Sequence, residues 1–300
     1  MALSKALVVG ASGLVGGALM RVLRGAQIDA VGTYAKCPRP GLEPLDITNS
    51  AQVRACVEHH RPAAIFLTAA LTHVDYCEEH GDEAFVINVE GPRAVAEAAR
   101  ALDAQLIFYS TDYIFDGKAG PYDEESHPSP LSVYGRTKLA AEQAIHETVD
   151  RALILRTTVV FGWDLTSTNF AMQVYHKVRA GERMTVPVDQ IGNPTLADYL
   201  AETSLVLAER GVSGIVNVVG KDLVARSDFA RALVKLYGGS PDLVVPVPTD
   251  SLNQKAPRPL RGGFRTEKLE GLMGRQAISL DDALQRLGQR WRAGGRDRHQ

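Results

Sequence analysis

Residues 6–23 have the sequence ALVVGASGLVGGALMRVL, in which a short apolar run passes through spaced glycines into a second apolar run. The run Ala6 to Val9 predicts a buried strand, and the run Val15 to Leu23 predicts a helix. Glycines at this spacing allow a tight turn, a close approach of the backbone to a pyrophosphate, and close packing of helix on strand. The pattern predicts a phosphate-binding turn, and a glycine-rich turn without a ligand is the alternative. The three glycines are Gly10, Gly13 and Gly16.

A membrane span or signal peptide is a second interpretation of the same apolar stretch. Glycines interrupt the run, Ser12 and Arg21 lie within it, and no small-residue cleavage site follows. No other stretch approaches the roughly 20 apolar residues that cross a bilayer. We therefore expect no membrane segment and a cytoplasmic location.

Composition narrows the class of protein further. The 300 residues are 45% hydrophobic and 23% charged, which fits one large or two modest globular domains. The 33 basic and 35 acidic residues give a net charge of -2, so no basic field exists to bind nucleic acid or an anionic membrane. Cys37, Cys56 and Cys77 are an odd count in a long chain, which favours reduced structural thiols.

Strand-like and helix-like runs alternate through the first half of the chain, a pattern typical of a parallel sheet covered by helices on both faces. The fold class predicted is α/β, a doubly wound Rossmann sheet with a smaller, interleaved substrate-binding lobe. Further strands are expected at 29–33, 64–67, 105–109 and 152–157, and helices at 50–59, 83–102 and 132–149.

The alternation loosens after Phe161, where the smaller lobe is expected to begin. The predicted dinucleotide-binding domain covers 1–160, with returning segments near 190–210 and 278–290. The predicted lobe covers 161–189 and 211–275. The last residues, 290–300, are expected to form a frayed tail.

The segment after the second strand bears on the choice of dinucleotide. An acidic residue there would bind the ribose 2′-hydroxyl of NAD, but residues 33–39 (TYAKCPR) contain no acid. Lys36 and Arg39 can instead face a 2′-phosphate, which favours NADP(H) and leaves NAD(H) as the alternative. Both residues are otherwise solvated loop charges.

Tyr134 and Lys138 lie four residues apart at the start of a predicted helix and therefore share one face. Lowering a tyrosine pKa by about three units takes roughly 4 kcal/mol, and one ammonium about 4 Å away supplies a similar amount. Ser110 and Thr111 end the preceding strand, where ligands of open α/β sheets bind. Because strand side chains alternate, only one of these two hydroxyls is expected to face a substrate.

These motifs resemble the extended short-chain dehydrogenase/reductase superfamily and, within it, the dTDP-4-dehydrorhamnose reductase family. Besides the glycine turn, the similarity rests on 69–75 (AALTHVD), 110–117 (STDYIFDG), 134–138 (YGRTK) and 189–195 (DQIGNPT). It extends over nearly the whole chain. The family reaction that the resemblance implies is NAD(P)H-dependent reduction of the 4-keto group of a nucleotide-linked deoxysugar.

The resemblance also implies roles for individual residues. Thr111 would polarise the carbonyl, Tyr134 would donate the proton, and Lys138 would tune Tyr134 and hold the nicotinamide ribose. The implied cofactor-binding residues are Gly10, Ser12, Gly13, Leu14, Val15, Gly16, Tyr34, Lys36, Asp46, Ile47, Ala69, Ala70, Tyr134 and Lys138. The expected substrate-binding residues are Thr72, Val74, Asp112, Tyr113 and Arg258.

Two departures from the family pattern fall on positions that serve the substrate. The family usually has an Asn-Ser pair after 256–259 (APRP), where this chain has Leu260 and Arg261, and it has a tryptophan where this chain has Val159. Trp163 is a candidate replacement as a stacking face, with buried packing as its alternative role. Arg261, like Arg258, is a candidate for a substrate diphosphate because guanidinium groups suit phosphate oxygens.

Other functions remain open from the sequence. A sugar-nucleotide epimerase shares the cofactor motifs, as does a non-catalytic NADP-binding subunit similar to the beta subunit of methionine adenosyltransferase. A 4,6-dehydratase is disfavoured because Tyr113 occupies the position of its acidic residue. No metal site is expected, since Cys56, His59 and His60 have no second ligand cluster. A homodimer is one expected assembly.

Overall fold

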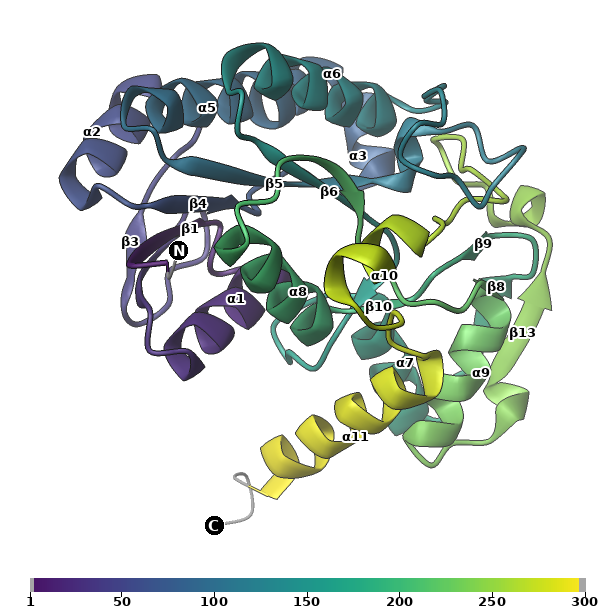
Figure 1. Cartoon of the computed structure of the whole chain (residues 1–300). Coiled ribbons are helices and arrows are strands. Elements are labelled where there is room, and N and C mark those ends of the chain that lie inside the picture. Colours follow the sequence, from purple (N-terminus) through teal and green to yellow (C-terminus); the bar gives the residue numbers. More distant parts are fainter. Residues whose placement is uncertain (1–2, 297–300) are drawn as a thin grey trace.

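The computed structural model describes residues 3–296 and contains a seven-stranded parallel sheet (Figure 1). Its strand order is β11-β6-β5-β4-β1-β2-β3. β2 and β3 therefore lie on one side of β1, and the later strands of the sheet, from β4 onward, lie on its other side. This arrangement confirms the predicted doubly wound fold. The strands are β1 (Lys5–Val9), β2 (Asp29–Tyr34), β3 (Leu42–Pro44), β4 (Ala64–Leu67), β5 (Gln105–Thr111), β6 (Leu153–Thr157) and β11 (Gly214–Asn217).

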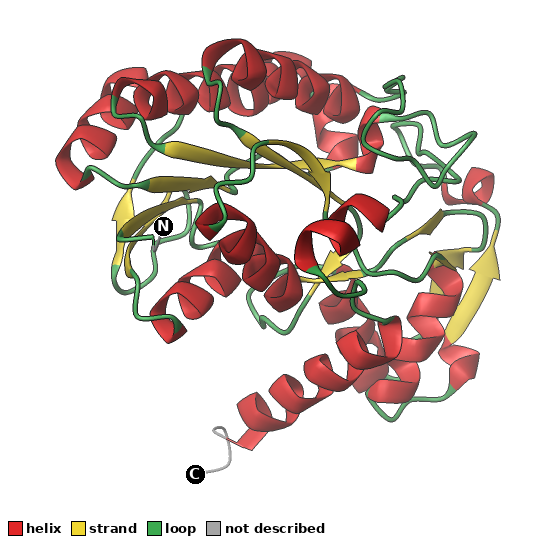
Figure 2. Ribbon diagram, in the orientation of Figure 1, coloured by secondary structure: helices red, strands yellow, loops and turns green. Residues whose placement is uncertain are grey.

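Helices cover both faces of the sheet, as Figure 2 shows. Side chains alternate along β1, so Ala6 and Val8 belong to one buried cluster and Leu7 and Val9 to another. The first cluster includes α1 (Leu14–Gly25) and α8 (Ala197–Glu209), and the second includes α2 (Ser50–His60), α5 (Gly91–Ala101) and α6 (Val133–Thr148).

The predicted helix at 83–102 is built from several segments. It follows α3 (Val74–Glu79) and consists of α4 (Gly81–Phe85), a π-helical turn at Val86–Glu90, and α5. Pro92 lies in the first turn of α5, just after this π-helical turn, so the irregular turn stands where the chain has a residue without an N–H. The backbone stays helical through Pro92.

The smaller lobe lies beside the carboxyl ends of the strands (Figure 1). Its helices are α7 (Phe170–Ala180) and α9 (Arg226–Leu236). Three strand pairs accompany them: β7 (Val160–Phe161) with β10 (Thr195–Leu196), β8 (Met184–Pro187) with β13 (Val244–Val247), and β9 (Ile191–Gly192) with β12 (Val224–Ala225). The remaining elements before the last helix are α10 (Glu267–Met273) and short 3-10 turns at Asp112–Ile114, Pro241–Leu243 and Thr249–Leu252.

One predicted lobe boundary needs correction. The segment 211–275 was assigned to the lobe, but Gly214–Asn217 is β11 and pairs in parallel with β6 at the edge of the central sheet. This strand begins with glycine, ends with asparagine and has only two apolar residues between them, which gives a weak sequence signal. The rest of the predicted domain division stays a prediction.

The predicted frayed tail is wrong for residues 290–296, which belong to α11 (Leu280–Arg296). The Trp291 ring packs edge-on against Tyr237 with centroids 5.3 Å apart, and Arg290 pairs with Asp198 on α8. An apolar anchor and an ion pair therefore hold this helix. Residues 297–300 of the expected tail lie outside the described part of the chain.

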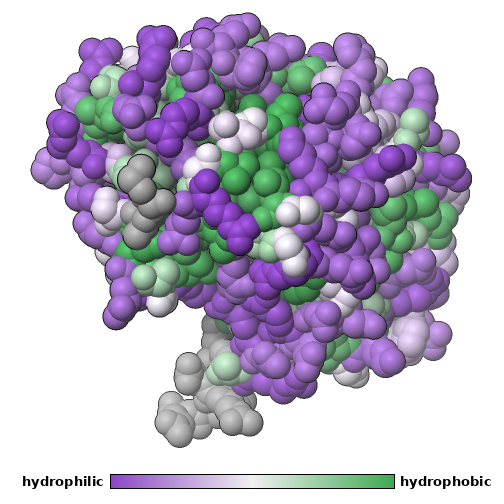
Figure 3. Space-filling view, viewed as in Figure 1, coloured by the Kyte–Doolittle hydropathy of each residue, from purple (hydrophilic) through white to green (hydrophobic). Residues whose placement is uncertain are grey.

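Hydrophilic residues cover most of the face seen in Figure 3, and apolar residues gather near its centre. Among the described residues, no helix is both long enough and apolar enough to cross a bilayer.

Candidate active site

The glycine turn closes tightly over the end of β1. Gly10 has a φ of +94°, a conformation that L side chains rarely adopt. A Cβ on Gly16 would lie 2.3 Å from the carbonyl oxygen of Gly10, so only glycine fits there. The Thr68 hydroxyl donates to the carbonyls of Val9 and Gly10, which fixes the turn against β4.

The turn presents the amino end of α1 without a competing acid. Gly13 is the N-cap residue and offers no side-chain acceptor, and the first turn of α1 contains no acidic residue. The first amide groups of a helix lack partners within the helix, and the helix dipole favours negative charge near them. This end of α1 therefore suits a phosphate group.

A cavity of about 590 Å³ opens beside the turn. Parallel strands end at the same edge of a sheet, so the residues that follow β1, β4, β5 and β6 meet in its wall. The cavity brings together twelve of the sequence-predicted residues: Gly13, Leu14, Val15, Gly16, Ala70, Thr72, Val74, Thr111, Asp112, Tyr113, Tyr134 and Lys138.

The other wall residues were not in the predicted set, although the sequence singled out Ser110 as the alternative hydroxyl and Val159 as a departure from the family pattern. They are Thr68, His73, Tyr109, Ser110, Thr157, Thr158, Val159, Val160, Ser167, Thr168 and Asn169. The position of 157–160 at the end of β6, next to β5, is the signal that could have found four of them. The loop 167–169 belongs to the lobe and has no motif that points to the cavity.

The remaining predicted residues do not line this cavity: Gly10, Ser12, Tyr34, Lys36, Asp46, Ile47, Ala69 and Arg258. Gly10 and Ala69 pack on each other, because a Cβ on Gly10 would lie 2.7 Å from the Ala69 nitrogen. The Ile47 side chain is buried against Gly91. The Asp46 carboxylate accepts bonds from the Thr48 amide and hydroxyl.

Tyr134 is buried in the first turn of α6. Ser132 caps this helix by accepting a hydrogen bond from the Gly135 amide at 3.2 Å, which fixes where the helix begins. Burial raises the pKa of Tyr134, and a hydrogen bond to Thr111 acts in the opposite direction. The phenol therefore keeps its proton at neutral pH and can serve as a donor.

Lys138 lies one turn further along α6, and its ammonium binds to the backbone of the neighbouring strand β5. Nζ donates to the carbonyl oxygen of Tyr109 at 2.7 Å and lies 3.9 Å from the centre of the Phe108 ring. Burial lowers the pKa of Lys138 to about 7, and Glu142 acts against this shift. The lowering of the Tyr134 pKa by Lys138 therefore stays a prediction.

Asp112 joins the reactive hydroxyl to the lobe. Its carboxylate accepts from the Thr111 hydroxyl at 3.3 Å and from the Gly263 amide at 3.4 Å, while burial raises its pKa. A Cβ on Gly262 would lie 2.5 Å from Oδ2 of Asp112. The absence of a side chain at Gly262 thus leaves room for this carboxylate. Ser110 also belongs to the cavity wall, but its hydroxyl is buried, and the expectation that only one of the two hydroxyls faces a substrate stays a prediction.

Several other sequence candidates are held by neighbours. Arg39 pairs with Asp164 at 3.2 Å. Trp163 packs edge-on against Tyr175 with centroids 4.9 Å apart, so it has the packing role rather than that of a stacking face on the cavity. Val159, which stands where the family has tryptophan, lines the cavity with a φ of +46°. A β-branched residue in this region is a backbone outlier, and such outliers cluster at ligand sites.

The donor set fits a dinucleotide. Ser110 Oγ and Thr157 Oγ1 are buried and have no hydrogen-bond partner, and both residues lie in the cavity wall beside the glycine turn. Buried polar groups are normally paired, so these two hydroxyls are available to a ligand. Within residues 3–296, no group of three or more His, Cys, Asp or Glu side chains is arranged to hold a metal ion.

The sequence model of one protein family, described as "RmlD substrate binding domain", matches residues 4–292. The chain belongs to this family. A relative from Streptomyces griseus, named dTDP-4-dehydrorhamnose reductase, is 37% identical over 84% of this chain and 83% of its own. A Haloferax volcanii protein, named probable low-salt glycan biosynthesis reductase Agl14, is 32% identical over 94% of this chain and 96% of its own.

Solved structures agree with this assignment. The crystal structure of dTDP-4-dehydrorhamnose reductase from Bacillus anthracis in complex with NADP superposes with a TM-score of 0.88. It is 31% identical and covers 95% of this chain and 98% of its own. The RmlD-type fold of this chain therefore extends through both the sheet and the lobe.

Proposed function

We propose that this protein reduces the 4-keto group of a nucleotide-linked deoxysugar and uses NADP(H) as the cofactor. The observation that carries the proposal is the single cavity in which Thr111, Tyr134 and Lys138 lie beside the glycine turn. Family membership and relatives named as dTDP-4-dehydrorhamnose reductases support the same reaction.

The residues divide the work in the following way. Thr111 donates a hydrogen bond to the carbonyl oxygen and orients it beside Tyr134. Tyr134 gives its proton to that oxygen as the carbonyl becomes a secondary alcohol. NADPH, when bound, supplies the hydride that the carbonyl carbon receives. Lys138 holds the ribose next to the nicotinamide. The single Thr111 O–H, which donates to Asp112 in this structure, turns to the carbonyl oxygen when the substrate binds.

The glycine turn and the amino end of α1 bind the cofactor pyrophosphate through backbone amides. Ser110 and Thr157 supply hydroxyls on the cavity floor. Lys36 and Arg39 receive the 2′-phosphate, for which Arg39 must exchange its partner Asp164. The contacts of Ser12, Tyr34, Asp46, Ile47 and Ala69 with the cofactor stay predictions, as do the homodimer and the cytoplasmic location.

The test is NADPH oxidation, followed at the nicotinamide absorbance, against a panel of nucleotide-linked 4-ketosugars. Removing the phenolic hydroxyl in Tyr134→Phe is expected to lower kcat by about 10²- to 10⁴-fold, the usual contribution of a general acid. Tyr175→Phe removes a hydroxyl outside the cavity and is the matched control.

Two results would contradict the proposal. The first is absence of turnover with every substrate of the panel. The second is a Tyr134→Phe variant with wild-type kcat. Absence of turnover together with intact NADPH binding would support the non-catalytic binding subunit instead.

A further inference from the structure

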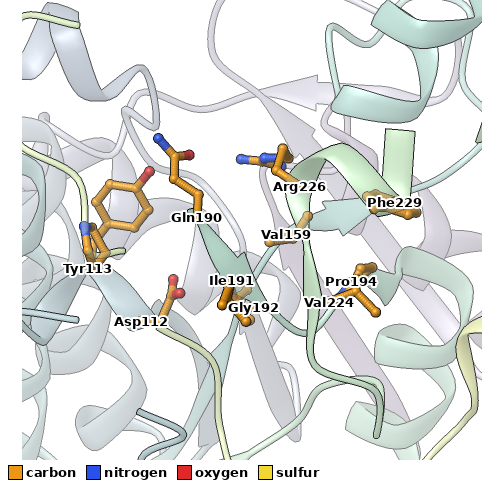
Figure 4. Close-up of a pocket in the computed structure, with 12 residues that line it drawn as sticks. Asp112, Tyr113, Val159, Gln190, Ile191, Gly192, Pro194, Val224, Arg226 and Phe229 are labelled. Carbon is orange, nitrogen blue, oxygen red and sulfur yellow. The ribbon is translucent and has the colours of Figure 1, made fainter. Parts of the chain in front are cut away.

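A second, smaller cavity of about 70 Å³ adjoins the main one and shares Asp112, Tyr113 and Val159 with it. This volume holds a group of several heavy atoms rather than a whole nucleotide sugar. Figure 4 shows polar side chains of different elements in its wall, with the ends of Arg226, Gln190 and Tyr113 directed toward one another. The cavity therefore combines a small size with a few polar groups in a largely apolar wall.

Arg226 is the cation of this wall. Its amide donates to the Gln190 carbonyl at 2.9 Å, and its guanidinium lies 4.7 Å from the centre of the Phe170 ring. Within the described residues, no carboxylate lies within 4.0 Å of this guanidinium. An arginine stays charged in proteins, and a partly buried charge that has only the more distant Asp112 carboxylate to attract it, and no direct ion pair, is unfavourable. An anionic ligand would compensate for that cost.

The sequence candidates for an anion are less available. The Arg258 guanidinium is paired with Asp75 at 3.0 Å and donates to the Ala256 carbonyl at 2.8 Å. Arg261 is exposed in the segment after Pro259 and does not line either cavity. Arg226 is thus the guanidinium that faces the cavity without an ion pair.

One acidic group faces the same space and has to be considered. The Asp112 carboxylate lines the small cavity, but hydrogen bonds from Thr111, Thr158 and the Gly263 amide occupy it. The Thr111 hydroxyl donates to Oδ1 and the Gly263 amide to Oδ2, so both carboxylate oxygens already have protein donors. These donors partly offset the negative charge that Asp112 presents to an anion.

We infer that Arg226, assisted by Gln190 and Tyr113, binds the diphosphate of the substrate in this small cavity. The inference rests on the proposed function: the small cavity shares Asp112 and Tyr113 with the main one, so it adjoins the place where a sugar with its carbonyl at Thr111 and Tyr134 would lie. In a nucleotide sugar the group attached to the ring is the diphosphate. Guanidinium groups recognise phosphate oxygens through paired hydrogen bonds.

Calorimetric titration with thymidine 5′-diphosphate and thymidine 5′-monophosphate tests the inference without turnover. Arg226→Gln is expected to weaken diphosphate binding by about 10- to 100-fold and monophosphate binding by less, since hydrogen bonds to charged groups carry this magnitude. Arg226→Lys should recover part of the loss. Arg231→Gln is the control, because Arg231 lies on the same helix, pairs with Asp228 and does not line the cavity.

Unchanged NADPH binding and an unchanged melting temperature would show that Arg226→Gln is folded. Diphosphate binding equal to wild type in that variant would overturn the inference and leave the proposed reductase intact. Diphosphate binding that depends on Arg226 in a protein without turnover would support the inference and contradict the reductase. Absence of diphosphate binding by the wild-type protein would overturn the inference as well.

Discussion

Lys138 shows at the scale of one residue how burial changes the chemistry of a side chain. Its folded-state pKa of about 7 lies below the ordinary value of 10.5, so between these values the folded protein binds fewer protons than the unfolded chain. Stability rises with pH wherever the unfolded state binds more protons. The free energy of unfolding is therefore expected to increase from pH 7 to pH 10, by up to about 4 kcal/mol.

Urea denaturation at several pH values, without added cofactor, measures this dependence. Lys138→Met should remove most of the rise and should be more stable than wild type near pH 7. Lys235→Met changes an exposed lysine and should keep the wild-type pH dependence. If the Lys138→Met protein keeps the full rise, the lysine is not the group responsible.

Sequence spacing predicted which residues would meet, but not how their polar ends would be directed. Tyr134 and Lys138 share a helix face as expected, yet Nζ donates to the Tyr109 carbonyl on the neighbouring strand. Arg258 has the right chemistry for a phosphate but pairs with Asp75. Partners such as these come from distant parts of the chain, so no local pattern can reveal them.

At the scale of elements, a buried ion pair fixes α6 on the sheet. Arg156 on β6 pairs with Glu142 on α6 at 2.8 Å, and both side chains are at most 5% exposed. Glu142 lies one turn after Lys138, so the pair fixes the position of α6 on the sheet and, with it, the position of Tyr134 in the cavity wall. Arg156 also donates to the Glu124 carbonyl, which holds the loop before α6.

Removing one charge of this pair is expected to be costly. Glu142→Gln should lower the free energy of unfolding by about 3–5 kcal/mol, because it leaves the Arg156 charge buried without its counterion. Glu147→Gln on the exposed part of α6 should change stability by no more than about 0.5 kcal/mol. Chemical denaturation of the two variants beside wild type gives both values, and equal stabilities would show that the pair does not hold the helix.

Elements with strong periodic patterns were predicted well, and weakly patterned ones were not. Residues 64–67 and 153–157 form fully buried strands within the predicted ranges. They could be predicted because apolar runs are typical of the strands of a parallel sheet. The edge strand β11 was missed for the opposite reason, since it has only Ile215 and Val216 as apolar residues. The end of α11 was predicted to be a frayed tail, because the packing of Trp291 on Tyr237 is a contact between segments far apart in the sequence.

For the whole molecule, the lobe and the sheet share one buried cluster. It runs from Ala6 on β1 through Leu200 on α8 to Phe229 on α9 and Leu287 on α11. The sequence predicted interleaved segments, but a shared cluster depends on which helix faces meet. Because the cluster is continuous, the lobe has a fixed support next to the cavity.

The ion pair between Arg39 and Asp164 is a second link across the molecule, from the loop after β2 to the loop before α7. Because a 2′-phosphate would take Arg39 from Asp164, Lys36→Ala combined with Arg39→Ala should weaken NADPH binding by at least about tenfold and NADH binding much less. Asp164→Asn keeps an oxygen for the Thr166 amide but loses the competing charge, so it should tighten NADPH by about 2- to 5-fold and leave NADH unchanged. Fluorescence titration with both nucleotides measures these changes, with the exposed Arg100→Ala as control. Equal losses for NADPH and NADH in the double variant would show that these charges do not contact a 2′-phosphate. In that case Arg39 serves only to join the two loops.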